Sequence, residues 1–237
     1  MAVQDDWRER EMCRLIGLRA GEGRSDVDAF LDFEAFGKAY SSPLELKSTT
    51  NYSVSTARDV GPDHIAKWRS RIWVFGFYDS SGANLQKILT LGPADMEEWI
   101  GKIESYIAPD FAIGERIADK LDLEDLYIIC GEKRKYSLSD AIALHKRQWS
   151  RDKYLSEMDA EDGYTPGKML EILRLRTIYL NQRGATLNNP HIPASFFSQF
   201  KAETIDATNT NVDEVAALTQ RKIRQITLDH KALQQAR

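Results

Sequence analysis

The chain has 237 residues, of which 42% are hydrophobic and 29% charged, and its net charge is −4. This composition allows a sizeable core and argues against a protein that coats nucleic acid nonspecifically, and no apolar run approaches the roughly 18 residues of a membrane helix. Because the N-terminus has no apolar signal core and Cys13 and Cys130 lie far apart, a reduced, cytoplasmic protein is expected.

The first elements in chain order are a helix and two strands. The first 20 residues predict the helix, which GEGRS (21–25) ends. DVDAFLDFEAF (26–36) alternates as a strand that carries Asp26 and Asp28 on its polar face. A loop is expected around Gly37 to Pro43. LELK (44–47) then predicts a strand in which Glu45 and Lys47 share one face.

The next segments complete an α/β pattern. GPDHIAKWR (61–69) predicts a short helix, and RIWVFGFY (71–78) predicts an apolar strand suited to the centre of a sheet. NLQKILTL (84–91) predicts a further strand, and a helix follows from Pro93 to about residue 107. This order indicates a mixed central β-sheet flanked by helices. The basic cluster KWRSR (67–71) is interpreted as a solvated face and His64 as a structural side chain.

The second half of the chain is predicted to be mainly helical. Residues 110–186 form a helical insertion or subdomain, with Gly184 as a helix stop. TLNNPHIP (186–193) predicts a loop, because two asparagines and two prolines cannot continue a helix. A final amphipathic helix is expected from Val212 to about residue 235. No linker is long enough to separate independent domains, so a single domain over residues 1–237 is expected.

Acidic and basic side chains lie on the polar faces of the two early strands. If these strands pair as neighbours, the carboxylates of Asp26 or Asp28 and of Glu45 converge, and Lys47 joins them. Converged carboxylates repel each other unless a cation is present, and hard oxygen ligands suit Mg²⁺. A bound Mg²⁺ would orient a water and neutralise charge on a phosphate. The alternative is a salt-bridged strand face without a catalytic role.

Several motifs, in the same order along the chain, resemble one enzyme family. The Asp…Glu-x-Lys arrangement resembles the PD-(D/E)xK nuclease superfamily. Three further segments are similar to motifs of PvuII-like type II restriction endonucleases: STARDVGPDHIAKWRSRIWVFGFY (55–78), LGPADMEEW (91–99) and LNNPHIP (187–193). The resemblance covers about residues 20–107 and 187–200 and leaves the helical block without a counterpart. It implies a restriction-endonuclease-like fold with a catalytic core in those two ranges.

The resemblance also implies roles for individual residues. Glu45 maps onto the metal-binding glutamate and Lys47 onto the catalytic lysine. The metal-binding aspartate is Asp28 or Asp26, with Asp28 preferred. The candidates for DNA contact are Ser55, Arg58, Asn188, Asn189 and His191. Arginine suits guanine and asparagine suits adenine, whereas the alternatives are a turn role for the asparagines and an ion pair for Arg58.

The function implied by this resemblance is that of a type II restriction endonuclease. Such an enzyme uses Mg²⁺ to hydrolyse both strands of duplex DNA at a short, palindromic site and leaves 5′-phosphates. A homodimer is expected because a two-fold protein matches a two-fold site, and the N-terminal helix is the candidate interface by analogy. A cognate DNA methyltransferase is expected as the genetic partner. The alternatives are a structure- or damage-specific nuclease of the same superfamily and a catalytically silent DNA-binding module.

Overall fold

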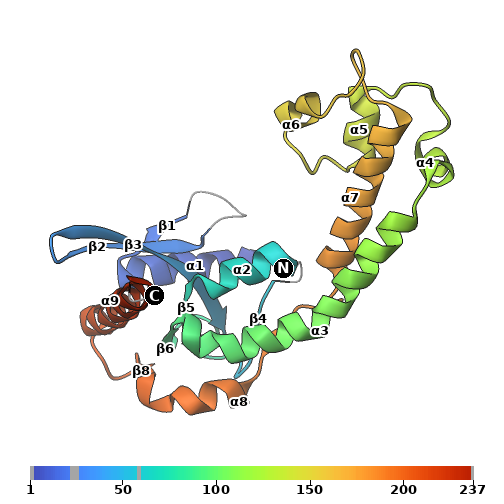
Figure 1. Ribbon diagram of the computed structural model, residues 1–237. Helices are drawn as coiled ribbons and strands as arrows, with labels where there is room; N and C mark the ends of the chain where they lie inside the picture. Colours follow the sequence, from blue (N-terminus) through green and yellow to red (C-terminus); the bar gives the residue numbers. More distant parts are fainter. Residues whose placement is uncertain (1–2, 22–26, 58–59, 236–237) are drawn as a thin grey trace. The chain divides into compact units, whose positions relative to one another are not determined.

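The structure is a computed structural model that describes residues 3–21, 27–57 and 60–235 (Figure 1). The chain divides into two compact units, each described here by itself. The first comprises residues 1–57, 63–103 and 188–237, and the second residues 58–62 and 104–187. Among the described helices, none is long and apolar enough to cross a membrane.

A six-stranded mixed sheet forms the centre of the first unit. Its strand order is β1-β2-β3-β5-β6-β8. The pair β3–β5 is parallel, and the other neighbouring pairs are antiparallel. The strands are β1 (Arg19–Ala20), β2 (Ala29–Ala35), β3 (Lys38–Thr49), β5 (Ile72–Tyr78), β6 (Leu85–Leu91) and β8 (Ile205–Asp206). The expected α/β class with a mixed sheet is thereby confirmed, as is the central place of the apolar strand β5.

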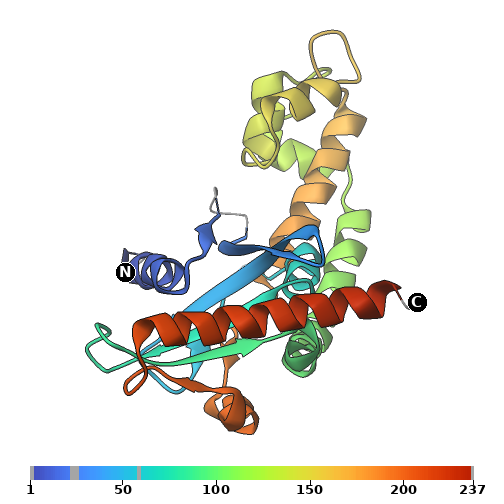
Figure 2. The ribbon, with the colours of Figure 1, turned by 90° about the vertical axis from the view of Figure 1, so that its left-hand side faces the viewer.

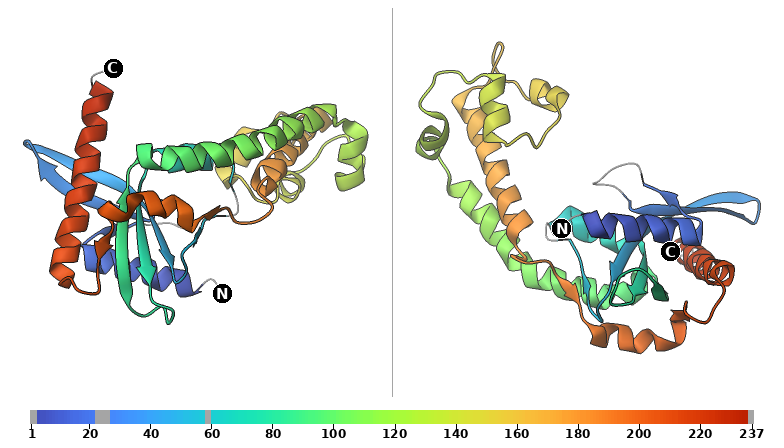
Figure 3. Two further views of the ribbon diagram at one scale, coloured as in Figure 1. Left: turned by 90° about the horizontal axis from the view of Figure 1, so that it is seen from below. Right: turned by 180° about the vertical axis from the view of Figure 1, so that it is seen from behind.

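Helices cover both faces of this sheet. On one face α1 (Val3–Ile16) and α9 (Val212–Gln235) pack over Leu44, Leu46 and Val74. The two helices contact each other and cross at a large angle, so that α1 is seen end-on where α9 is seen lengthwise (Figures 2 and 3). On the other face α2 (Pro62–Arg69), the start of α3 (Pro93–Lys120) and α8 (Ala194–Phe197) enclose an aromatic cluster. Its members include Trp68, Trp73, Phe75, Trp99 and Phe197.

The connection between β2 and β3 differs from the expected loop. Ala35 pairs with Lys38, so the turn consists of Phe36 and Gly37 alone, both with positive φ (51° and 69°). This is the backbone of a tight two-residue hairpin turn. The prediction of a loop from Gly37 to Pro43 is therefore wrong. Pro43 is tolerated inside β3 because pairing with β5 starts only at Leu44, and the strand has β2 alone beside it at Pro43.

The remaining early elements lie close to their predicted positions. The N-terminal helix, the short helix from Pro62 and the strands at 72–78 and 85–91 are confirmed. The alternation in β2 is also confirmed, since Ala29, Leu31 and Phe33 are buried in the core under α1 and α9. The strand itself begins at Ala29.

Helix α3 is longer than the sequence pattern indicates. The helix expected to reach about residue 107 continues without a break through Pro109 to Lys120. A proline fits helical φ and removes one backbone hydrogen bond, so the surrounding turns carry the helix past it. The predicted helical block consequently starts inside a helix that begins at Pro93.

The second unit is a helical assembly with its own core. Besides the later part of α3, it contains α4 (Leu123–Cys130), α5 (Leu138–Leu144), α6 (Arg151–Ser156) and α7 (Pro166–Gly184). The core includes Leu126, Tyr136, Tyr154, Tyr164, Met169 and Ile172. Thr165 caps α7, and Gly184 is its last residue, as predicted. The helical character of residues 110–186 is confirmed.

A second, two-stranded sheet joins distant parts of the first unit. In it β4 (Val54–Ser55) pairs antiparallel with β7 (His191–Ile192). The segment TLNNPHIP, expected to be entirely loop, therefore contains a short strand. A residue that precedes proline is held in extended conformation, which accounts for Ile192 before Pro193. The predicted C-terminal helix is confirmed as α9.

Candidate active site

The pairing of β2 with β3 brings Asp28 beside the Glu45–Lys47 segment. Ala29 lies opposite Leu44 in the hairpin, so the residue before β2 reaches the middle of β3. The carboxylate Oδ2 of Asp28 accepts a hydrogen bond from the backbone N–H of Leu46 at 2.8 Å. The strands are thus neighbours, as the sequence argument requires. The other candidate aspartate, Asp26, lies outside the described residues.

Three charged side chains converge at this point. The Nζ of Lys47 lies 2.7 Å from Oε1 of Glu45 and 3.6 Å from Oδ2 of Asp28. It also donates a hydrogen bond to the carbonyl of Leu46 at 2.9 Å. The side chains of Glu45 and Lys47 are only 6% and 16% exposed, so the three charges meet in a largely buried place.

A fourth charge belongs to the same cluster and was missed by the sequence argument. The Nη1 of Arg71 donates to Oε2 of Glu45 at 2.6 Å, and the arginine side chain is 8% exposed. The interpretation of KWRSR as a solvated face is therefore wrong for Arg71. Arg71 directly precedes β5, which pairs with β3 from Leu44 onward, and this tertiary pairing rather than any sequence pattern brings it to Glu45.

The protonation states follow from burial and from the neighbouring charges. Burial raises the pKa of Asp28 above its ordinary value, and Lys47 offsets only part of that rise. For Glu45 burial acts in the same direction, but Lys47 and Arg71 together hold its pKa below the ordinary value. Burial opposes the charge of Lys47, yet Glu45 and Asp28 raise the pKa of this lysine above its ordinary value. Lys47 is therefore an ammonium group at neutral pH.

Two further titratable residues face the cluster. Glu9 in α1 is close enough to Lys47 to contribute to the rise in the lysine pKa. His64 in α2 packs edge-on against Trp68 with ring centroids 4.7 Å apart. Burial lowers the pKa of His64, and Glu45 and Lys47 both act on it electrostatically. The packing of His64 agrees with a structural side chain. The sequence alone did not indicate that this histidine lies close enough to the charged cluster to be affected by it.

A divalent cation at this place would need several oxygen ligands. Among the described residues, no group of three or more His, Cys, Asp and Glu side chains is arranged to hold a metal ion. Asp28 and Glu45 offer two carboxylates, and the carbonyl of Leu46 faces the same Nζ that contacts both. Carboxylate and carbonyl oxygens together with waters are the ligands that Mg²⁺ prefers, so these residues fit a hydrated Mg²⁺.

Most of the candidate DNA contacts gather at the two-stranded sheet. Ser55 lies opposite His191, and both side chains are exposed. The Nδ2 of Asn189 donates to Oγ of Ser55 at 3.3 Å, and Asn188 is the exposed neighbour. The structure thus brings together residues 55 and 188–191, which are far apart in sequence. Arg58 lies outside the described residues.

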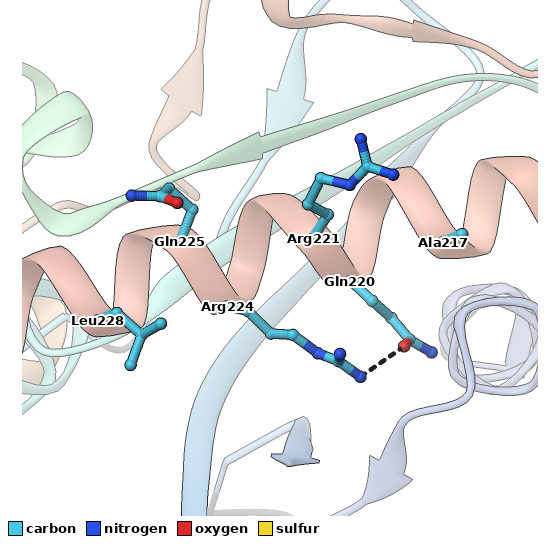
Figure 4. Close-up of a pocket in the computed structure, with 6 residues that line it drawn as sticks. All are labelled: Ala217, Gln220, Arg221, Arg224, Gln225 and Leu228. Atoms are coloured by element: carbon cyan, nitrogen blue, oxygen red, sulfur yellow. Dashed lines mark hydrogen bonds between the residues drawn. The ribbon is translucent and has the colours of Figure 1, made fainter. Parts of the chain in front are cut away.

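A pocket along α9 has different surroundings. It is lined by Ala217, Gln220, Arg221, Arg224, Gln225 and Leu228 (Figure 4). Arg224 donates to Gln220 at 3.2 Å, and its guanidinium lies over the ring of Phe33. Because α9 packs on the Leu44 and Leu46 face of the sheet, this pocket does not belong to the cluster formed by Glu45 and Lys47.

Comparison with known proteins adds no assignment: no protein-family model matches the chain, and no curated protein matches it significantly. The chemistry of the site therefore has to be argued from its residues.

Proposed function

We propose that this protein is a Mg²⁺-dependent type II restriction endonuclease with a restriction-endonuclease-like fold. It acts on double-stranded DNA as a homodimer, hydrolyses both strands at a specific sequence and leaves 5′-phosphates. A cognate DNA methyltransferase is its expected genetic partner. The observation that carries the proposal is the meeting of Asp28, Glu45 and Lys47 in one buried cluster, because these are the residue types of the Asp…Glu-x-Lys motif.

The buried charges argue against a purely structural role for the cluster. Removing two carboxylates and two cations from water is costly, and apolar side chains of similar volume usually serve stability as well or better. Asp28 in particular remains in a place where its ionised form is disfavoured. A group held in such a state is a candidate for function, since a cation or a reacting group relieves the cost.

Each residue has a role that follows from its position. Asp28 and Glu45 would hold Mg²⁺, which when bound supplies a polarised water and neutralises charge on the phosphate. The backbone N–H of Leu46 orients the Asp28 carboxylate, and Arg71 orients that of Glu45. Lys47, as an ammonium group, donates hydrogen bonds and stabilises the negative charge that develops on the phosphate oxygens. Its raised pKa favours this role over that of a general base.

The exposed side chains at the two-stranded sheet are proposed to contact DNA. Ser55, Asn189 and His191 present hydroxyl, amide and imidazole groups at one place, and Asn188 extends the row. An asparagine amide can bond to adenine through two hydrogen bonds, and a hydroxyl suits several bases. Because Ser55 and His191 stand on paired backbone and Asn189 bonds to Ser55, these three groups are held together before DNA arrives. Arg58 is proposed as a further base contact.

The first experiment is digestion of unmethylated plasmid and phage DNA with Mg²⁺ and with chelator, followed by sequencing of the fragment ends. Discrete fragments that share one short sequence, formed only with Mg²⁺, would support the proposal. Breaks without a shared sequence would favour a structure- or damage-specific nuclease. Binding without cleavage would favour a catalytically silent DNA-binding module.

The variants that test the site have matched controls on the same strands. Glu45→Gln and Lys47→Met are expected to lower the cleavage rate by at least about a hundredfold, because each removes a charge that acts in the transition state. Glu34→Gln in β2 and Lys38→Met in β3 change the same residue types at exposed positions and should retain the wild-type rate. Retained cleavage by Lys47→Met would contradict the role given to this lysine.

A further inference from the structure

Arg71 is the second cation of the charged cluster, beside Lys47. It is anchored more deeply than Lys47, with a side chain 8% exposed against 16%. The two cations divide the glutamate between them: Arg71 bonds to Oε2, and Lys47 lies at Oε1. Each oxygen of Glu45 therefore has its own positive partner.

Among the four side chains that contact one another, the charges balance without any metal. Asp28 and Glu45 supply two negative charges, and Lys47 and Arg71 supply two positive ones. A divalent cation that enters this buried place meets two carboxylates whose charges Lys47 and Arg71 already balance, and added positive charge is costly in a poorly solvated environment. Removal of either cation would leave the cluster negative and would make it attractive to a metal ion.

The two cations differ in how readily they can move. Lys47 has a flexible stem, and its Nζ reaches both acids and the Leu46 carbonyl. Arg71 is buried and makes a short, charge-assisted hydrogen bond to the one acid. An incoming ion can therefore displace the lysine head from the carboxylates, whereas Arg71 stays on Glu45 and keeps its positive charge in place.

We propose that Arg71 is a positioning residue that fixes Glu45 and, by completing the neutralisation of the cluster, keeps divalent cations weakly bound until a DNA phosphodiester enters with them. The negative phosphodiester supplies the charge that the free protein lacks. By reciprocity, DNA then strengthens metal binding to the same extent as metal strengthens DNA binding. This inference rests on the proposed function and assigns the regulation of its metal site.

The direct test is titration of the free protein with Mn²⁺. Binding is measured by calorimetry and, separately, from the electron paramagnetic resonance signal of unbound Mn²⁺. Mn²⁺ prefers the same oxygen ligands as Mg²⁺. We expect Arg71→Gln and Arg71→Met to bind Mn²⁺ at least about tenfold more tightly than wild type, because a unit positive charge close to the ion is lost. Arg71→Lys, which keeps the charge, should bind Mn²⁺ as weakly as wild type.

Arg69→Gln provides the matched control. Arg69 lies two residues away and pairs with Glu97 on the exposed surface, so its replacement should leave Mn²⁺ affinity unchanged. Thermal unfolding checks that each variant folds, and Arg71→Gln is the milder substitution because its amide can still donate to Glu45. Equal or weaker Mn²⁺ binding by folded Arg71→Gln than by wild type would overturn the inference, as would the absence of binding by both.

The cleavage assay gives a second, independent readout. In wild type the Mg²⁺ concentration for half-maximal rate should fall as the DNA concentration rises. In Arg71→Gln this concentration should start lower and depend less on DNA, while the maximal rate falls because Glu45 is less well held. If the Mg²⁺ concentration for half-maximal rate in wild type does not change with DNA concentration, the proposed coupling between metal binding and DNA binding is contradicted. If no DNA is cleaved, the proposed function fails, whereas the Mn²⁺ titration still decides the role of Arg71.

Discussion

At the scale of single residues, the two acids of the cluster differ although they share one lysine. Glu45 has a cation at each oxygen, and its pKa lies below the ordinary value in spite of burial. Asp28 has the Leu46 N–H and a lysine at 3.6 Å, and burial prevails, so its pKa lies above the ordinary value. The structure therefore stabilises the charge of one acid and disfavours that of the other.

The raised pKa of Asp28 predicts how stability depends on pH. The folded state holds a proton on this acid more tightly than the unfolded chain does. Its contribution to stability is therefore present below the ordinary aspartate pKa of about 3.9 and is lost as pH rises through the raised value. We expect Asp28→Asn to unfold at a higher temperature than wild type at pH 8 in chelator. This advantage should shrink as the pH falls towards about 4.

Thermal unfolding of both proteins across this pH range measures the effect. Asp32→Asn is the control, because Asp32 is exposed on the same strand and Arg19 and Ser41 hold its pKa below the ordinary value. The difference between that variant and wild type should have the opposite sign. A lower unfolding temperature for Asp28→Asn at pH 8 would show that the ionised carboxylate stabilises the fold.

At the scale of elements, the position of Asp28 depends on a glycine in the segment before β2. The N–H of Gly21 donates to the carbonyl of Asp28 at 3.0 Å. A Cβ on Gly21 would lie 1.8 Å from the carbonyl oxygen of Val27, a distance that the backbone must relieve by moving. We expect Gly21→Ala to displace Asp28 and to weaken Mn²⁺ binding, as measured by calorimetry.

Gly37→Ala separates this effect from general damage to the hairpin. Gly37 has positive φ at the β2–β3 turn and open space around it, so alanine should cost about 1 kcal/mol through backbone strain. Mn²⁺ affinity should remain at the wild-type value in this variant. Equal losses of affinity in both variants would mean that the hairpin as a whole, and not the Gly21 contact, positions the acid.

The pairing of β4 with β7 yields a prediction about DNA recognition. Asn189 is exposed and bonds to Ser55, so Asn189→Ala should leave the unfolding temperature unchanged. If the amide reads a base, the preference for the cleavage site over variant sites should fall by about 1–3 kcal/mol. Competition cleavage of oligonucleotides that differ at single positions measures this preference.

Thr56→Val is the structural counterpart of that substitution. The buried hydroxyl of Thr56 donates to the carbonyl of Pro190 at 2.9 Å, beside the backbone bond that joins the same two residues. Loss of this bond should cost about 1 kcal/mol of stability without relaxing sequence preference. Relaxed preference in Thr56→Val but not in Asn189→Ala would assign recognition to the backbone conformation instead.

At the scale of the whole molecule, the two units have separate clusters of buried side chains. Met169 belongs to the helical unit and Ile88 to the sheet, and both are fully buried. We expect Met169→Ala to cost about 2–5 kcal/mol locally and to speed hydrogen exchange in α5 and α7 far more than in β3 and β5. Ile88→Ala should show the opposite distribution. Uniform acceleration in both variants would mean that the chain unfolds as one cooperative body.

The expected homodimer is also a property of the whole molecule. Sedimentation should give a species of twice the 27.0 kDa chain mass, and plasmid should pass to the linear form without accumulation of nicked circles. A monomer that accumulates nicked circles would contradict the proposed two-strand cleavage. This measurement is independent of the metal-binding variants.

Local sequence determined the identity of most elements. Alternation in residues 29–35, the apolar run before Tyr78 and the start at Pro62 depend on side chains that are neighbours along the chain, and each predicted its element correctly. The hairpin turn was missed because Phe36 is a poor candidate for positive φ. The length of α3 was missed because Pro109 is an unfavourable helix residue.

In the site, too, some features follow from the local sequence and others depend on tertiary contacts. Strand periodicity placed Glu45 and Lys47 on one strand face and left Asp26 and Asp28 as alternatives for the aspartate. Arg71 and the meeting of Ser55 with Asn189 depended on which strands pair, and the short pattern around each residue carries no information about that. The sequence by itself thus determined which charges lie on one strand face. Only the tertiary structure decided their partners and protonation, because those depend on burial and on contacts between segments far apart in the chain.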